Sequence, residues 1–296
     1  MQERKTIGWI GVGLMGSRIV PRLLDAGYKV VVNDVMKDNC AGALELGATF
    51  ADSPAAVTEQ ADYIFSMIPN SEILKIVALG EGGVATTIGQ GQVYVDLSTV
   101  DPVTSGEVAQ VIEEKGGKHI RVCVSGSVSH VDSGSLTILA SGEREAYEEI
   151  SPIFEVMGNK QYYLGQKEEA RTMKIIVNML LGTTIQAYAE ALVLGQAAGI
   201  DFNEMLRVIS DSSAANAMMK AKESNVAVRD FAPMFTGKNM AKDMSLAMDV
   251  ANAHHLTLPL AGITRQMYGT MSTHGVEDLD YSGVLLVNEI LNGIKN

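Results

Sequence analysis

Short apolar runs alternate with amphipathic stretches through the first 165 residues. Each run is rich in β-branched or aromatic residues and ends at a turn signal, which predicts a buried strand. Strands are expected within residues 6–13, 29–34, 61–70, 92–98, 119–126, 136–142 and 161–165. Because helical stretches connect these strands, we expect parallel pairing with right-handed crossovers, which is the doubly wound α/β plan.

The hydrophobic pattern changes after Gly165, where helical periodicity continues nearly to the end of the chain and no segment has the pattern of a strand. The polar segment 166–170, QKEEA, marks the expected boundary, and a long apolar helix follows over residues 170–200. The sequence therefore predicts an α/β domain over residues 1–166 and an all-helical domain over residues 167–296.

Composition and charge restrict the partners of the chain. The net charge of −12 argues against a nucleic-acid or anionic-membrane partner, because no basic stripe offsets it. Two cysteines, Cys40 and Cys123, are too few for a disulfide framework or a zinc site. The first residues lack the pattern of a signal peptide, and no run of about 20 uninterrupted apolar residues predicts a membrane span. A cytoplasmic location is expected.

A glycine-rich turn follows the first predicted strand and opens the first predicted helix. The segment GVGLMG places Gly11, Gly13 and Gly16 in G-x-G-x-x-G spacing. In a dinucleotide site the first glycine permits a tight turn, the second lets the backbone approach the pyrophosphate, and the third lets helix and strand pack closely. The helix N-terminus then attracts the phosphates. Three neighbouring residues complete the expected cofactor contacts: Leu14, Met15 and Asn33.

Asp34 ends the second strand, 18 residues after Gly16 and close to the offset of about 20 for a ribose-binding acid. A carboxylate there accepts hydrogen bonds from the adenosine 2′-OH and repels a 2′-phosphate. The nearest cation is Lys37, and no arginine follows the acid. The sequence thus favours NAD over NADP, unless Asp34 is only an ordinary turn residue at the end of a strand.

Two later strand ends should line the same crevice, because ligands of open α/β sheets bind beyond the carboxyl ends of the strands. One contains Met67, Ile68 and Pro69, and the other contains Ser98 and Thr99. The two hydroxyls are expected near a ribose or the nicotinamide. The alternative is that Ser98 or Thr99 only caps the helix that begins near residue 102.

Several motifs in one order resemble the β-hydroxyacid dehydrogenase family, which includes 3-hydroxyisobutyrate dehydrogenase and tartronate semialdehyde reductase. The resemblance covers nearly the whole chain and depends on GVGLMG, MIPN, DLSTVDP, VSG, KIIVN and KDMSLAMDVA. It implies a Rossmann domain with a doubly wound parallel sheet, a long interdomain helix, an all-helical C-terminal domain, and assembly as a homodimer or homotetramer.

The same resemblance implies roles for individual residues. The catalytic lysine of the family corresponds to Lys174 and its partner asparagine to Asn178. The Ser-Gly pair that holds the substrate carboxylate corresponds to Ser125 and Gly126. A later lysine near the nicotinamide corresponds to Lys242. The cofactor is NAD, the substrate is a small carboxylate, and no metal is needed.

Elementary chemistry supports the assignment of Lys174. Residues four apart lie on one helical face, so Lys174 and Asn178 are expected to point together into a cleft between the domains. Partial desolvation can lower the pKa of a lysine toward ~7–8, which suits proton transfer. Lys174 would accept the hydroxyl proton during oxidation and return it during reduction. The alternative is a surface lysine whose charged end reaches water.

Residues 121–131 depart from the family pattern around the substrate. The usual Asp-Ala-Pro and second glycine are replaced by Arg121, Val122, Cys123 and Ser127. Arg121 either binds a second substrate carboxylate or pairs with a neighbouring acid, and the second interpretation is favoured. His130 is either a substrate contact or an ordinary loop residue.

Three functions are compatible with this sequence. The leading hypothesis is an NAD-dependent oxidoreductase that acts on a small 3-hydroxy acid or its semialdehyde, with Lys174 as general acid and base. An imine reductase-like enzyme is the alternative among enzymes, although the retained Lys174 and Asn178 argue against it. The alternative from another class is a catalytically silent NAD-binding scaffold, which the altered loop supports.

Overall fold

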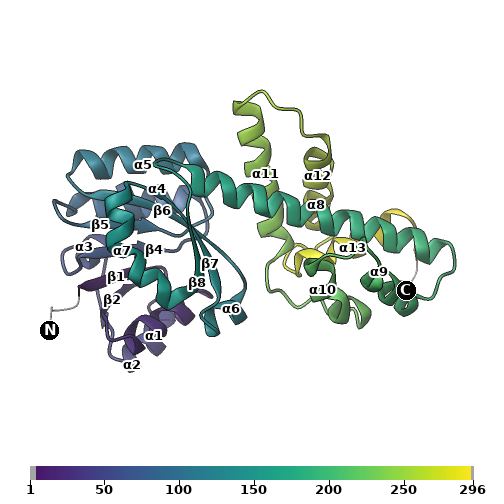
Figure 1. The fold of residues 1–296 in the computed structure, drawn as a ribbon, viewed down its shortest axis with the longest axis horizontal. Coiled ribbons are helices and arrows are strands. Elements are labelled where there is room, and N and C mark those ends of the chain that lie inside the picture. Colours follow the sequence, from purple (N-terminus) through teal and green to yellow (C-terminus); the bar gives the residue numbers. More distant parts are fainter. Residues whose placement is uncertain (1–4, 295–296) are drawn as a thin grey trace. The chain divides into compact units, whose positions relative to one another are not determined.

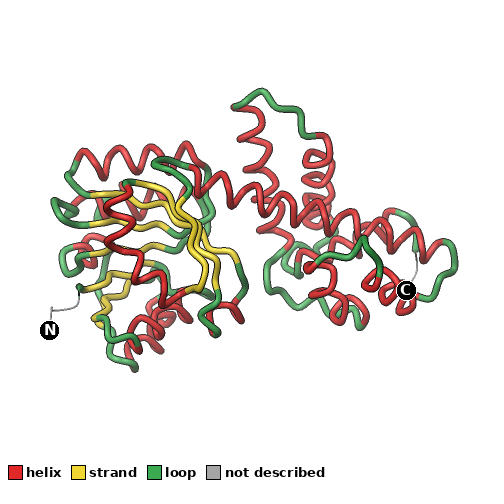
Figure 2. The backbone as a smooth tube through the Cα atoms, viewed as in Figure 1, coloured by secondary structure: helices red, strands yellow, loops and turns green. Residues whose placement is uncertain are grey.

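The computed structural model describes residues 5–294, which form two compact units that meet between Lys174 and Ile175 (Figures 1 and 2). The first unit is built on one eight-stranded sheet in the order β3-β2-β1-β4-β5-β6-β7-β8. The strands are β1 (Thr6–Ile10), β2 (Lys29–Asn33), β3 (Thr49–Phe50), β4 (Tyr63–Ser66), β5 (Val93–Asp96), β6 (Lys118–Ser125), β7 (Leu136–Gly142) and β8 (Gly158–Tyr163).

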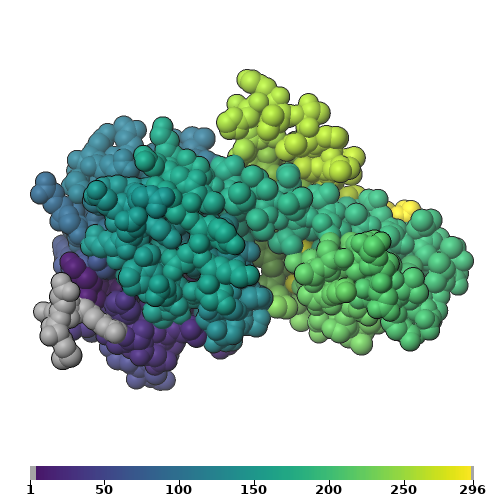
Figure 3. All heavy atoms as spheres, in the orientation of Figure 1, coloured from purple at the N-terminus to yellow at the C-terminus, as the bar shows by residue number. Residues whose placement is uncertain are grey.

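Helices cover both faces of this sheet (Figure 1). They are α1 (Gly16–Asp25), α2 (Ala41–Glu45), α3 (Pro54–Thr58), α4 (Ser71–Leu79), α5 (Pro102–Glu114), α6 (Val128–Asp132) and α7 (Arg144–Met157), with 3-10 turns η1 (Lys37–Cys40) and η2 (Val84–Thr86). Apolar side chains of α1, α2 and α7 pack on one face, and those of α3, α4 and α5 pack on the other. The predicted doubly wound architecture is confirmed. Figure 3 shows all heavy atoms in the same orientation, coloured along the sequence.

Strand direction is the point at which the predicted sheet differs from the observed one. Strands β1 to β6 pair in parallel, but β7 runs antiparallel to β6, and β8 follows β7 in parallel. Only the ten residues 126–135 separate β6 from β7. A parallel crossover needs a dozen or more residues, so this connection can only return the chain in the opposite direction.

The second unit contains only helices among its described residues, apart from one isolated bridge between Thr236 and Asp280. The helices are α8 (Glu169–Ala197), which begins in the first unit, α9 (Phe202–Asp211), α10 (Ala217–Ala227), α11 (Gly237–Ala253), α12 (Pro259–Thr273), η3 (Tyr281–Gly283) and α13 (Val284–Leu291). Side chains from α8 to α13 share one apolar core, as the helical periodicity predicts.

Helix α8 is long and apolar enough to cross a membrane by length and composition alone. However, Ile185, Tyr188 and Leu192 of this helix are buried in the core of the second unit. The central helix of a globular domain has the same length and composition. In this structure the three side chains belong to the apolar core of the second unit.

A buried ion pair fixes the first turn of α8 to the sheet. Arg171 and Asp96 have fully buried side chains, and the guanidinium Nη2 lies 2.5 Å from the Asp96 Oδ2 atom. The same guanidinium donates to the backbone carbonyls of Ser98 (2.5 Å) and Val122 (3.0 Å). Three links thus join α8 to the carboxyl end of β5 and to β6, and the first unit includes this first turn of α8.

His119 is a second buried ionisable group in this part of the sheet. Its ring stacks on Tyr94 with 5.2 Å between centroids, and neither ring nitrogen has a hydrogen-bond partner among residues 5–294. Burial, together with the charges of Arg121 and Arg171, lowers the pKa of the His119 imidazole well below its usual value. The folded chain therefore holds this histidine neutral.

Breaking the buried ion pair should destabilise the first unit strongly. Arg171→Met removes the guanidinium and leaves the Asp96 carboxylate buried without its partner, which should cost ~3–5 kcal/mol of unfolding free energy. Urea titration followed by Trp9 fluorescence measures this, because Trp9 is the single tryptophan and lies in this unit. Arg18→Met, which removes an exposed pair with Asp132, should cost at most ~1 kcal/mol. Equal effects of the two substitutions would contradict the anchoring role.

Acid should destabilise the first unit through His119. The folded-state pKa is depressed, so below about pH 6.5 the unfolded chain binds a proton that the folded chain does not, and stability is lost as the pH falls. The loss approaches ~1.4 kcal/mol for each further pH unit. His119→Phe keeps an aromatic ring stacked on Tyr94 and removes the group that titrates. The unfolding free energy of this variant, relative to that of wild type, should therefore be higher at pH 5 than at pH 7. The same fluorescence titration at both pH values tests this, and parallel pH dependence of variant and wild type would refute it.

Candidate active site

The glycine-rich turn joins β1 to α1 and shows why each glycine is needed. Gly11 has a φ of +92°, and an added Cβ would lie 2.4 Å from the Met67 carbonyl oxygen. A Cβ on Gly16 would lie 2.4 Å from the Gly11 carbonyl oxygen. A Cβ added to Gly13 would have no other atom within 4 Å, so the space beside this residue is open. The first and third glycines are required by packing inside the chain, and the second is available for the close approach of a ligand.

Helix α1 begins directly after this turn without a side-chain cap. Its N-cap residue, Met15, makes no capping hydrogen bond. The first backbone N–H groups of a helix need partners and carry partial positive charge, so an uncapped N-terminus beside an open glycine suits a phosphate. Leu14 is exposed at the tip of the turn, whereas Met15 packs against the sheet core. The turn fits the pyrophosphate of a dinucleotide.

Asp34 holds the glycine-rich turn in place. Its carboxylate accepts hydrogen bonds from the backbone N–H of Val12 (2.7 Å) and of Met36 (2.8 Å), and from the Asn39 side chain (3.0 Å). The carboxylate is half-buried and lies at the carboxyl edge of the sheet, beside the turn. Asn33, by contrast, donates its side-chain amide to the Ala51 carbonyl oxygen, so it stabilises the end of β2.

Ser98 has a structural role in the next loop along the sheet. Its hydroxyl donates to Asp96 Oδ1 (2.6 Å) and accepts from the backbone N–H of Ile68 (3.0 Å), and its side chain is buried. This bond fixes the segment from Met67 to Pro69. Of the two predicted ribose-side hydroxyls, that of Ser98 is therefore engaged inside the chain, and the Thr99 side chain is half-buried.

The helix-capping alternative for these two hydroxyls is wrong. Helix α5 is capped by Asp101, which accepts a hydrogen bond from the Thr104 backbone N–H at 2.7 Å.

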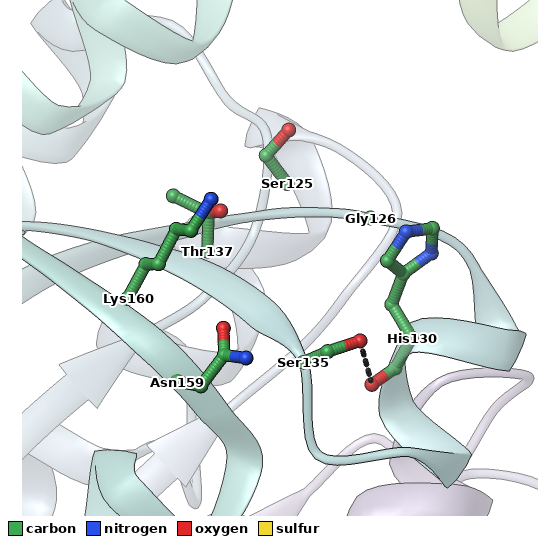
Figure 4. Close-up of a pocket in the computed structure, with 7 residues that line it drawn as sticks. All are labelled: Ser125, Gly126, His130, Ser135, Thr137, Asn159 and Lys160. Carbon is green, nitrogen blue, oxygen red and sulfur yellow. Dashed lines mark hydrogen bonds between the residues drawn. The ribbon is translucent and has the colours of Figure 1, made fainter. Parts of the chain in front are cut away.

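Ser125 and Gly126 end β6 and border a pocket of about 390 Å³ (Figure 4). Gly126 has a φ of +140°, and a Cβ there would lie 2.8 Å from the Leu136 side chain and 2.9 Å from that of His130. A glycine is therefore needed for the chain to turn here. Helix α6 starts at the next residues, where the Ser127 backbone N–H donates to His130 Nδ1 (3.1 Å).

Arg121 pairs with a neighbouring acid rather than facing the pocket. Its Nε lies 2.7 Å from Glu168 Oε1, and its Nη1 donates to the His119 carbonyl oxygen at 3.1 Å. Only 5% of Arg121 is exposed. This confirms the favoured interpretation of Arg121 and leaves the pairing with a second substrate carboxylate without support.

Lys174 is half-buried and lies one helical turn after Ala170 and Arg171, which pack against the sheet. Burial raises the pKa of the Cys123 thiol, while the nearby positive charges of Arg171 and Lys174 act in the opposite direction. The predicted proton donor and the predicted carboxylate site, Ser125 and Gly126, both belong to the first unit.

Asn178, Asp243 and Lys242 form a cluster in the second unit. The buried Asn178 amide donates to Asp243 Oδ2 (2.5 Å), and the Lys242 amine lies 3.1 Å from Asp243 Oδ1. The structure thus joins Asn178 and Lys242 through one carboxylate. Asp243 was not assigned from the sequence, although its place beside Lys242 and its full burial mark it as a functional candidate.

Family comparisons agree with this arrangement. Residues 6–165 match the model described as the NAD binding domain of 6-phosphogluconate dehydrogenase. Residues 169–287 match the model described as the NAD-binding domain of NADP-dependent 3-hydroxyisobutyrate dehydrogenase. The two matches divide the chain where the sequence pattern changes.

Individual relatives extend over the whole chain. Glyoxylate/succinic semialdehyde reductase 1 of Arabidopsis thaliana is 33% identical over 94% of this chain and 96% of its own length. The cytokine-like nuclear factor N-PAC of Homo sapiens is 35% identical over 95% of this chain, which spans about half (51%) of that protein. The crystal structure of 3-hydroxyisobutyrate dehydrogenase from Salmonella typhimurium has a TM-score of 0.86 and 26% identity, covering 96% of this chain and 100% of that one. The chain belongs to the β-hydroxyacid dehydrogenase family.

Proposed function

We propose that the protein is an NAD-dependent oxidoreductase that interconverts a small 3-hydroxy acid and its semialdehyde. The observation that carries the proposal is the position of Lys174. It follows the buried Arg171 anchor by one turn, and the Arg171 guanidinium bonds the Val122 carbonyl oxygen of β6, the strand that ends at Ser125. A reactive amine and a carboxylate-binding loop are thereby held in one part of the unit that carries the dinucleotide turn.

The reaction needs a proton and a hydride, which come from different groups. A bound nicotinamide dinucleotide supplies or accepts the hydride at the substrate carbon. In the reduction, the Lys174 ammonium donates its proton to the carbonyl oxygen as that oxygen gains charge. In the oxidation, the neutral amine accepts the hydroxyl proton. Neither direction requires a metal ion.

The remaining residues bind and orient the substrate in this proposal. The Ser125 hydroxyl and the Gly126 backbone N–H hold the substrate carboxylate. Asp243 accepts a hydrogen bond from the Asn178 side-chain amide and pairs with the Lys242 amine. The family resemblance assigns Asn178 to the reacting oxygen and Lys242 to the nicotinamide. This division leaves Lys174 as the group that moves the proton.

The cofactor preference rests on Asp34. Its carboxylate is held beside the glycine turn by two backbone N–H groups, so it cannot move away from an incoming ribose without breaking the turn. A fixed negative charge at this place favours a 2′-OH over a 2′-phosphate. Lys37 is exposed and its amine lies 4.5 Å from the centre of the Phe50 ring. These contacts support NAD, although one matching family description names an NADP-dependent enzyme.

A second candidate function is binding without catalysis. The similarity to N-PAC, which is named as a nuclear factor, favours this candidate, as does the altered loop over residues 121–131. Under this candidate the chain would bind NAD and turn over no hydroxy acid. The retention of Lys174 next to the loop supports the catalytic proposal instead.

Removing the proposed proton donor should abolish most turnover. Lys174→Ala should lower kcat at least ~100-fold, the low end for general acid–base catalysis, while the Kd for NADH changes little. Initial rates with 3-hydroxyisobutyrate and with its semialdehyde, beside fluorescence titration of NADH, measure both quantities. Lys167→Ala removes an exposed lysine seven residues earlier and should leave kcat near that of wild type. Activity of Lys174→Ala close to wild type would refute the assignment.

Removing the Asp34 charge should relax the cofactor preference. Wild type should show a higher kcat/KM with NADH than with NADPH. Asp34→Asn keeps the shape of the side chain and should raise the NADPH-to-NADH ratio of kcat/KM by at least about tenfold, or ~1.4 kcal/mol. Asp38→Asn removes the same charge from an exposed position nearby and should leave the ratio unchanged. A wild-type preference for NADPH, or an unchanged ratio in Asp34→Asn, would contradict the account.

A further inference from the structure

The pocket beside Ser125 is lined only by neutral polar residues and potential cations. Its lining consists of Ser125, Gly126, His130, Ser135, Thr137, Asn159 and Lys160 (Figure 4). No carboxylate lines it, although acidic residues outnumber lysine and arginine by 35 to 23 in the whole chain. Its volume of about 390 Å³ lies within the usual range of small-molecule sites. The lining selects for an anion.

The sheet register places three of these residues in one row. Ser125 of β6 lies opposite Thr137 of β7, which lies opposite Lys160 of β8. The neighbouring row contains Cys123 and Leu139, which pack against Ala170 at the start of α8. Side chains two positions apart on a strand lie on the same face of the sheet. The row from Ser125 to Lys160 is therefore on the α8 face, one step closer to the carboxyl end of β6.

Lys160 supplies the charge at the far end of this row. Its side chain is exposed, and no carboxylate pairs with it among residues 5–294. The hydroxyl of Thr137 and the side-chain amide of Asn159 are its neighbours around the pocket. Hydrogen-bond donors and one unpaired ammonium thus face the same space.

His130 offers a further donor. Its Nδ1 accepts a hydrogen bond from the Ser127 backbone N–H, so the neutral ring carries its proton on Nε2. This tautomer presents an N–H group to a ligand and no acceptor.

We propose that this pocket binds a second anionic group of the substrate, at the end opposite the carboxylate held by Ser125 and Gly126. The inference rests on the proposed function and names its substrate class: a 3-hydroxy acid or semialdehyde whose side chain ends in a carboxylate or phosphate. Two strand spacings separate Ser125 from Lys160, roughly 10 Å between Cα atoms. A chain of about five carbons with an anionic group at each end spans this row once both groups are hydrogen-bonded.

Calorimetric titration of two matched acids in the presence of NAD tests the pocket without turnover. Glutarate carries two carboxylates, and valerate has the same chain length with one. Wild type should bind glutarate at least about tenfold more tightly than valerate, as expected for one hydrogen bond to a charged group. Lys160→Gln should remove most of this difference and leave valerate binding unchanged. Lys115→Gln, which removes an exposed lysine at the end of α5, should preserve the difference.

The outcomes separate the pocket from the proposed function. Equal affinities for glutarate and valerate in wild type, or an unchanged difference in Lys160→Gln, would overturn the inference, and turnover of 3-hydroxyisobutyrate would then still support the proposed function. Glutarate binding that depends on Lys160, in a protein that turns over no hydroxy acid, would support the pocket and refute the proposed function. Titration with 4-phosphonobutyrate, which replaces one carboxylate of glutarate by a phosphonate at the same chain length, distinguishes the group: tighter binding than glutarate supports a phosphate, and weaker binding supports a carboxylate.

Discussion

The buried ion pair between Asp96 and Arg171 is the interaction on which the proposed site depends. It joins the carboxyl end of β5 to the first turn of α8, and the same guanidinium bonds backbone carbonyls of Ser98 and Val122. Such a pair costs desolvation energy and contributes little net stability. Removing one partner, however, leaves a buried charge without compensation and destabilises the fold strongly. Its consequence is positional: the helix that carries Lys174 cannot turn or slide relative to the strand ends without leaving a charge buried and unpaired.

A second constraint acts at the same edge of the sheet. Asp34 accepts the backbone N–H groups of Val12 and Met36, and Gly11 and Gly16 pack where any side chain would clash. The turn is therefore preorganised without a ligand, and only Gly13 opens toward space. Fixed donors at a helix N-terminus and a fixed carboxylate are the features that a dinucleotide needs. The same edge of the sheet holds this turn and the end of β6, to which Arg171 joins the first turn of α8.

The local pattern of the sequence predicted much of the fold. Seven of the eight strands, the all-helical second half and the dinucleotide turn follow from periodicity and glycine spacing. The two-residue β3 is too short to leave a pattern, and the reversal of β7 depends on the length of a connection rather than on its composition. These features can be predicted from the sequence because each depends on residues that are close together in the chain.

The parts of the site that the sequence left open depend on distant residues. Asp96 and Arg171 are 75 positions apart, and the polar segment around Glu168 has the composition of a solvated boundary although Glu168 pairs with the buried Arg121. Ser98 and Thr99 are equivalent by sequence, and only the Asp96 and Ile68 contacts show that the Ser98 hydroxyl is engaged inside the chain. The row that ends at Lys160 exists only through strand register. Pairings between remote segments carry no local signal, so they required the structure.

Transfer of label from NADH carrying deuterium at the reactive nicotinamide position is the most direct test of the central claim. With methylmalonate semialdehyde, the oxidised form of 3-hydroxyisobutyrate, or another semialdehyde of a 3-hydroxy acid as substrate, we expect mass spectrometry to find one deuterium on the new alcohol carbon of each product molecule. Consumption of NADH with an unlabelled product, or NADH binding with no conversion of any semialdehyde, would contradict it.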